Sequence, residues 1–121
     1  MLPSKTLFEM GSLAKTRKVN PSFKIWLEVD GKPLIGKGGI EILRAIDREG
    51  SIAKAAKSLG MSYRYVWGYL SKIEKVFGEP VVKTRVGGVK GGGAELTKTG
   101  RWLVNKYLKL EDIVEKTLKK A

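Results

Sequence analysis

The sequence predicts a mainly helical domain with a small β-hairpin and a long C-terminal helix. Apolar residues recur at helical spacing over residues 40–46, 62–77 and 103–118. Strict alternation over residues 23–29, and a glycine-rich stretch between two β-like segments over residues 81–96, predict the strands. A length of 121 residues suits one domain and leaves little room for a second.

Composition narrows the classes of function. The 24 Lys and Arg residues outnumber the 12 Asp and Glu residues, and the formal net charge of +12 predicts a polyanionic partner such as DNA or RNA. The absence of Cys and His excludes disulfides, thiolate nucleophiles, a Ser-His-Asp triad and His-ligated metals. We therefore expect no enzyme, no metal and no cofactor. Without a long apolar run or a signal peptide, we also expect a cytoplasmic protein with no membrane partner.

The N-terminal third predicts an arm followed by a hairpin. Residues 1–20 are expected to form the arm, with one amphipathic helix as the alternative. Residues 23–29 alternate as a half-buried strand does. Asp30-Gly31 is a tight-turn signal, so a short returning strand is expected at Leu34-Ile35.

The middle of the chain predicts a helix-turn-helix. One helix ends at Gly50, and Ser51 is a suitable N-cap for a short, Ala-rich helix over residues 52–59. Gly60 provides a tight turn, and Ser62 caps a longer helix that runs to about residue 77. This order of short helix, glycine turn and capped second helix is typical of DNA-binding helix-turn-helix motifs.

The second helix of this pair separates into a core stripe and an outward face. The core stripe consists of Val66, Leu70, Ile73 and Phe77. The outward face, which we expect to contact DNA, carries Arg64, Gly68, Ser71, Lys72 and Lys75, flanked by Tyr65 and Trp67. The alternatives are a basic face that is merely solvated and, for Trp67, a place in a satellite core.

The glycine-rich hairpin that follows predicts a wing. A hairpin placed directly after a recognition helix can contact phosphates or the neighbouring minor groove, and basic side chains at its tip serve that contact. The basic residues on or beside this hairpin are Lys83, Arg85 and Lys90. The alternative is a floppy surface loop, and both interpretations hold if the loop becomes ordered on DNA.

Thr97 is the expected N-cap of a last helix that runs nearly to residue 121. Its 4-3-4 apolar spacing predicts a helix–helix contact between two copies of the chain. The predicted homodimer seam consists of Leu103, Tyr107, Leu110, Val114 and Leu118. The alternative is that the helix packs on its own core, with Trp102 and Ile113 also taking part. We thus assign residues 21–96 to DNA binding and residues 97–121 to dimerisation.

These residues resemble the DNA-binding domain of the ModE-type molybdate-responsive regulators. Residues 51–64 are similar to the start of that domain, and Trp67 falls at its helix tryptophan. Residues 77–82 contain its G-x-P segment, and residues 87–100 match its wing, G-G-x-x-G-G-G-A-x-L-T-x-x-G. The wider relatives are the LysR-type winged helices. The resemblance implies a dimeric winged helix that binds palindromic operator DNA and regulates transcription.

The resemblance also implies roles for individual residues. The recognition residues would be Ser62, Tyr63, Arg64 and Trp67, and Lys83, Arg85 and Lys90 would serve the wing. The molybdate-responsive regulators carry a C-terminal oxyanion-binding part that has no counterpart in these 121 residues, so we do not expect molybdate sensing here. An effector-sensing partner is left open. The alternative function is sequence-indifferent binding by an architectural or RNA-associated protein, which a low preference for any one site would reveal.

Overall fold

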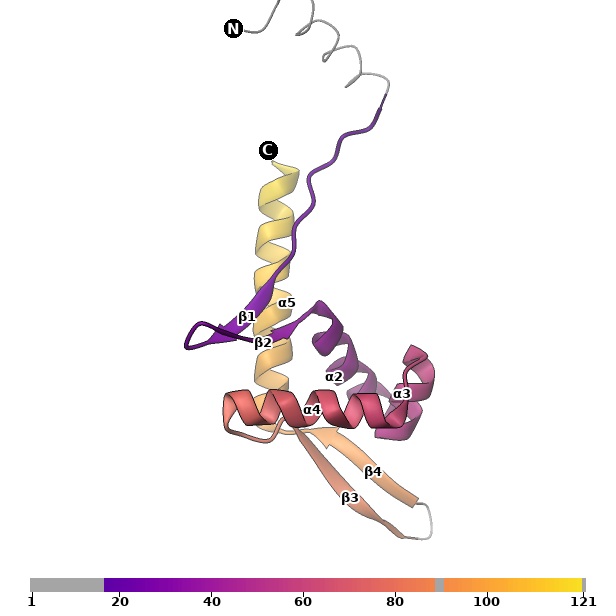
Figure 1. Cartoon of the computed structure of the whole chain (residues 1–121). Coiled ribbons are helices and arrows are strands. Elements are labelled where there is room, and N and C mark those ends of the chain that lie inside the picture. The colour runs from indigo at the N-terminus through magenta and orange to yellow at the C-terminus, as the bar shows by residue number, and fades with distance from the viewer. Residues whose placement is uncertain (1–16, 89–90, 121) are drawn as a thin grey trace, which may run out of the picture.

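The computed structural model describes residues 17–88 and 91–120. Within them, two strands are followed by three helices, a second pair of strands and a long helix, which is the predicted order (Figure 1). The expected arm over residues 1–20 lies mostly outside the described residues, and only its last four residues are seen, without regular structure.

The first hairpin pairs β1 (Trp26–Val29) with β2 (Lys32–Gly36) in antiparallel fashion. Asp30 and Gly31 both adopt positive φ at the turn, as the Asp-Gly signal predicts. The predicted alternation is confirmed over residues 25–29, because Ile25, Leu27 and Val29 pack against the core while the two residues between them are exposed. It fails at Phe23, which is exposed. The first strand begins three residues later than predicted, since residues 23–25 have no partner strand in the described chain.

Three helices follow at the predicted places: α2 (Lys37–Glu49), α3 (Ile52–Leu59) and α4 (Tyr63–Phe77). The Ser51 hydroxyl caps α3 by accepting a hydrogen bond from the Lys54 amide, as expected. Each helix ends at a glycine in the left-handed conformation, which side-chain-bearing residues rarely adopt. These glycines are Gly50, Gly60 and Gly78.

The second hairpin, the wing, pairs β3 (Val82–Gly88) with β4 (Gly91–Leu96). Its strands extend further into the glycine run than the predicted segments. Two backbone hydrogen bonds hold its base: Ala94 N donates to Gly50 O (2.9 Å), and Thr97 N donates to Val81 O (3.1 Å). The base is therefore fixed to the helical body, and the hairpin projects away from it (Figure 1).

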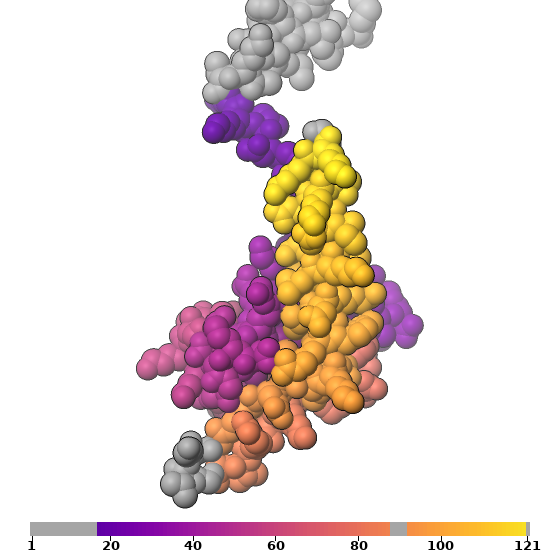
Figure 2. Space-filling view, turned by 180° about the vertical axis from the view of Figure 1, so that it is seen from behind, coloured from indigo at the N-terminus to yellow at the C-terminus, as the bar shows by residue number. Residues whose placement is uncertain are grey.

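The last helix, α5 (Lys98–Lys119), divides into a packed half and a projecting half. The Thr97 hydroxyl caps it by accepting a hydrogen bond from the Gly100 amide. Seen from behind, the C-terminal half of α5 rises beyond the helical body (Figure 2). Only its N-terminal half therefore belongs to the central core.

One hydrophobic core joins β2, the helices and the base of the wing. Each fully buried large aliphatic side chain stabilises such a core by about 1.5–3 kcal/mol. The largest of its fully buried side chains are Tyr107, Ile35, Ile40, Ile42, Leu43, Ile46, Leu70, Ile73, Leu103, Val66 and Val81. This core holds α4 on the opposite side of the body from α5 (Figures 1 and 2).

Candidate nucleic-acid interface

The turn between α3 and α4 fixes the direction of α4. Gly60 adopts φ of +68°, and Met61 N donates a hydrogen bond to Ala56 O (2.9 Å). The Ser62 hydroxyl accepts a hydrogen bond from the Tyr65 amide (3.0 Å), so it is used as the N-cap of α4. Ala56 is buried where the helices meet, and a larger side chain there would push them apart.

The core stripe of α4 faces inward as predicted. Val66, Leu70 and Ile73 are buried, and Phe77 is partly buried. The opposite face is exposed along the helix and is made of Arg64, Gly68, Ser71, Lys72 and Lys75. A Cβ added at Gly68 would meet no atom within 4 Å in the described part of the chain. The α4 backbone is therefore bare at the middle of this basic face.

Two aromatic side chains connect α4 to the wing. Tyr63 and Trp67 pack edge to face, with ring centroids 6.1 Å apart. Both line a cavity of about 220 Å³ whose other walls are the start of α3 and wing residues such as Thr84 and Gly92. Trp67 is 39% exposed, which excludes it from the core. Tyr65 lies on the other flank of α4, packed against Tyr69.

The wing carries its basic side chains on one face. Lys83 pairs with Glu95 and Arg85 pairs with Gly93 in the hairpin register, and both basic residues are exposed. Because side chains alternate along a strand, they lie on the face opposite to the buried Ala94. Lys90 lies outside the described residues.

Two acidic side chains near the C-terminal end of α4 hold the base of the wing. Glu74 Oε1 accepts a hydrogen bond from Val81 N (3.1 Å), and Glu79 Oε2 accepts one from the Thr99 hydroxyl (2.8 Å). Their carboxylates are thus directed to partners within the chain. The exposed face of α4 remains basic beside them.

The predicted dimer seam on α5 needs correction. Leu103 and Tyr107 are 1% and 2% exposed, because they pack into the core of their own chain. Leu110, Val114 and Leu118 are half-buried on the projecting half. Of the two residues that the alternative added to the core, Ile113 is exposed, and Trp102 is 53% exposed and packs only at the edge of the core. The ring of Trp102 instead stacks on Phe77, with centroids 6.5 Å apart.

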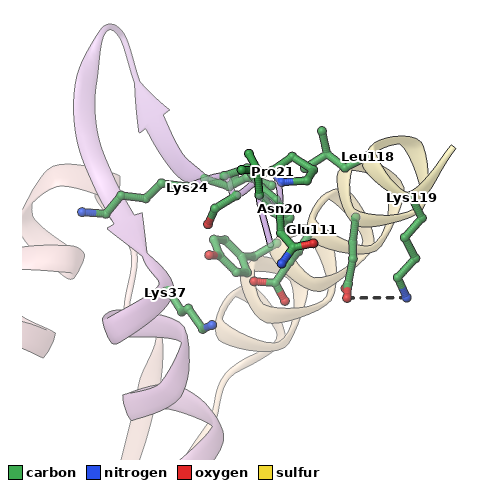
Figure 3. A pocket seen from close by; sticks show the side chains of 13 residues that line it. Asn20, Pro21, Lys24, Lys37, Glu111, Leu118 and Lys119 are labelled. Atoms are coloured by element: carbon green, nitrogen blue, oxygen red, sulfur yellow. Dashed lines mark ion pairs between the residues drawn. The ribbon is translucent and has the colours of Figure 1, made fainter. Parts of the chain in front are cut away.

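A larger cavity lies far from α4 and was not predicted. Its volume is about 790 Å³, and it separates residues 19–25 from α5, with Lys37, Tyr107 and Glu111 among its lining residues (Figure 3). Glu115 and Lys119 form an ion pair of 3.9 Å at its edge. Charges of both signs line it, so the cavity itself favours no class of ligand.

Sequence reasoning also missed the place of β1–β2 beside α4. Trp26, Pro33, Tyr69 and Lys72 line a third cavity, of about 130 Å³, between this hairpin and α4. Trp26 stands on the outward, polar side of an alternating strand, which is the signal that could have marked it. Among the described residues, no group of three or more His, Cys, Asp or Glu could hold a metal ion. No described helix has the length and apolarity to cross a membrane.

A family model described as "Bacterial regulatory helix-turn-helix protein, lysR family" matches residues 39–101. The chain belongs to this family. The match runs from α2 into α5 and leaves β1–β2 outside.

The relatives of this lysR-family chain confirm the predicted ModE-type resemblance. The molybdenum-pterin-binding protein MopA of Rhodobacter capsulatus is 36% identical over 92 residues, covering 76% of this chain and 35% of MopA. The DNA-binding transcriptional dual regulator ModE of Escherichia coli K12 is 35% identical over 77 residues, covering 64% of this chain and 29% of ModE. The chain thus spans about a third of the length of these relatives.

Solved structures confirm the winged-helix fold. A crystal structure described as a CbnR_DBD–DNA complex aligns with a TM-score of 0.53 at 19% identity. The alignment covers 69% of this chain and 90% of that one.

Proposed function

We propose that this chain is a sequence-specific double-stranded DNA-binding regulator of transcription that acts as a dimer. The exposed basic face of α4, placed beside a basic wing on a chain of net charge +12, carries the proposal. The major groove of B-DNA is wide enough to admit an α-helix, and each base pair presents a distinct pattern of donors and acceptors there. The similarity to the E. coli protein described as a DNA-binding transcriptional dual regulator supports the same function.

The residues divide by the kind of contact that they would make. Arg64, Ser71 and Lys72 on α4 would read base edges, because arginine and lysine donate to guanine and serine donates or accepts. Gly68 would let the backbone come close to the bases. Lys75 on α4, and the wing residues Lys83, Arg85 and Lys90, would bind phosphates and supply most of the affinity.

The two aromatic residues near the start of α4 would support DNA binding by positioning the wing relative to α4. Tyr63 and Trp67 close the space between α4 and the wing. Their packing sets how far apart these two DNA-binding elements stand. The Ser62 hydroxyl is committed to the α4 cap, so Ser62 would act by orienting the helix.

The dimer would form through the projecting half of α5. Its half-buried apolar residues Leu110, Val114 and Leu118 lie beyond the central core. Acidic residues 111, 112 and 115 precede basic residues 116, 119 and 120, so two antiparallel copies would set opposite charges against each other. Val114→Asp should convert a dimer to a monomer in sedimentation, whereas Ile113→Asp on the outer face should not.

Selection of bound duplexes from a random DNA pool at near-physiological salt tests the function. We expect a palindromic motif with half-sites about 34–36 Å, one helical turn, apart. A cognate preference of about 10³ or more over random DNA would support a regulator. Intact binding without any recovered motif would instead show the sequence-indifferent binder.

A further inference from the structure

The outer end of the wing is almost free of side chains. Apart from residues 89–90, which lie outside the described residues, the chain between Arg85 and Ala94 consists of Val86 and glycines. Paired strands lie only about 4.8 Å apart, so a hairpin of bare backbone is thin. The base of the wing is fixed to the helical body, and the strands project from there (Figure 1). The wing therefore presents a thin end with one apolar side chain beside it.

A β-bulge interrupts the wing at this side chain. Val86 and Gly87 of β3 stand opposite the single residue Gly92 of β4. A Cβ added at Gly92 would lie 2.7 Å from the carbonyl oxygen of Arg85, so the close approach of the two strands requires a glycine there. A bulge bends its strand and turns a side chain in a new direction. The residue of this bulge that carries a side chain is Val86.

The side chain of Val86 makes no contribution to the core. It is 99% exposed, the largest exposed fraction among the large apolar side chains of the described residues. Glycines surround it in the sequence, so the hairpin itself does not depend on a valine at this position. Transfer of apolar surface out of water is favourable, and Val86 has all of its surface left to bury in a complex.

We propose that Val86 enters the minor groove of DNA and selects A·T pairs over G·C pairs there. This inference rests on the proposed function. With α4 in the major groove, the neighbouring groove on the flank of the wing is the minor groove, which is about 6 Å wide. The thin end of the wing fits so narrow a groove. Valine has no group that binds phosphate, so its methyl groups contact the deoxyribose walls and the base edges instead.

One amino group distinguishes the two kinds of base pair in the minor groove. A·T pairs present only acceptors there, whereas a G·C pair adds the N2 amino group of guanine, a hydrogen-bond donor. This group would meet the methyl groups of Val86, which offer no acceptor, and a donor buried without a partner is costly. A·T tracts also have a narrow minor groove with enhanced negative potential, which suits the exposed Arg85 next to Val86.

The test varies the roughly three base pairs that flank each half-site of the selected duplex, because the wing lies beyond the base-reading helix. The flanks are A·T, G·C or inosine·C. Inosine lacks the N2 amino group and otherwise presents the same groups as guanine. We expect the wild-type chain to bind the A·T and inosine·C duplexes equally, and the G·C duplex about fivefold or more weakly.

Val86→Thr is the decisive variant. Threonine keeps the shape of valine and adds a hydroxyl that can accept a hydrogen bond from N2 of guanine. We therefore expect Val86→Thr to bind the three duplexes with nearly equal affinity. Val19→Thr makes the same substitution at another exposed valine, far from the wing, and should keep the wild-type preference. Neither variant should change the midpoint of thermal unfolding, since neither side chain is buried.

Three results would overturn the proposal. Binding to the inosine·C duplex as weak as to the G·C duplex would place the preference in the major groove. An unchanged preference in Val86→Thr would assign it to other residues. If selection recovers a motif but the wild-type chain binds all three duplexes equally, only the inference about Val86 fails. If selection recovers no motif, the proposed function fails, and Val86→Thr is compared with the wild type on mixed-sequence duplexes rich in A·T, inosine·C or G·C.

Discussion

The guanidinium group of Arg85 lies across Gly93 on the neighbouring strand of the wing. A Cβ added at Gly93 would be 2.7 Å from Nη2 and 3.2 Å from Nε of Arg85. The two residues are partners in the β3–β4 register. The missing side chain at position 93 therefore leaves the space in which a long cationic side chain lies flat on the exposed face of the wing.

Gly93→Ala should weaken DNA binding by displacing Arg85. The displaced group is the end of a flexible side chain, so stability should change by no more than about 0.5 kcal/mol. Affinity should fall toward that of Arg85→Ala, and adding Gly93→Ala to Arg85→Ala should have no further effect. A double-mutant cycle of DNA dissociation constants measures this coupling. Additive losses would show that Gly93 acts independently of Arg85.

Gly68→Ala should stabilise the fold and weaken cognate binding. Gly68 is an exposed residue inside α4, and alanine at such a position is favoured by about 1 kcal/mol. Thermal unfolding should show a midpoint raised by about 4 °C. The added methyl group would stand between the α4 backbone and the base edges. A variant that is more stable and binds its site as tightly as the wild type would show that the α4 backbone does not approach the base edges at Gly68.

Alkaline pH should destabilise the fold through Tyr107. Burial raises the pKa of Tyr107 above its ordinary value of 10.0, and the negative charge of Glu111 raises it further. Because the folded-state pKa is the higher one, this contribution is fully present below pH 10 and is lost as pH rises through the folded-state pKa. Burial likewise raises the pKa of Tyr69.

Urea unfolding as a function of pH measures this effect. Tyr107→Phe removes one of the two tyrosines whose pKa is raised by burial, so its free energy of unfolding should decline less steeply above pH 10 than that of the wild type. The same decline in both proteins would assign the alkaline sensitivity to other groups.

Local signals predicted the elements well because each depends on neighbours in the sequence. The serine caps at positions 51 and 62, and the glycines after α2, α3 and α4, set helix ends by local hydrogen bonds and backbone geometry. The outward face of α4 also followed from its own periodicity. Its basic and aromatic residues could be named from the sequence for the same reason.

Partners distant in the sequence could not be predicted in this way. The apolar spacing of α5 is the same whether the stripe meets a second chain or its own core, and Leu103 and Tyr107 proved to pack in the core. Trp102 stacks on Phe77 of α4, and this tertiary contact cannot be read from the apolar spacing of α5. The position of β1–β2 beside α4 depends on how Tyr69 packs against Gly39, which no periodicity reveals.

The most direct measurement compares wild type and Arg64→Ala on two duplexes, the selected site and a mixed-sequence control. If the exposed face of α4 reads base edges, Arg64→Ala should lose about 1–3 kcal/mol more on the selected site than on the control. The ratio of the two affinities should therefore fall by about 5-fold to 150-fold. Equal losses on both duplexes would make Arg64 a phosphate contact and would contradict base reading by this residue of α4.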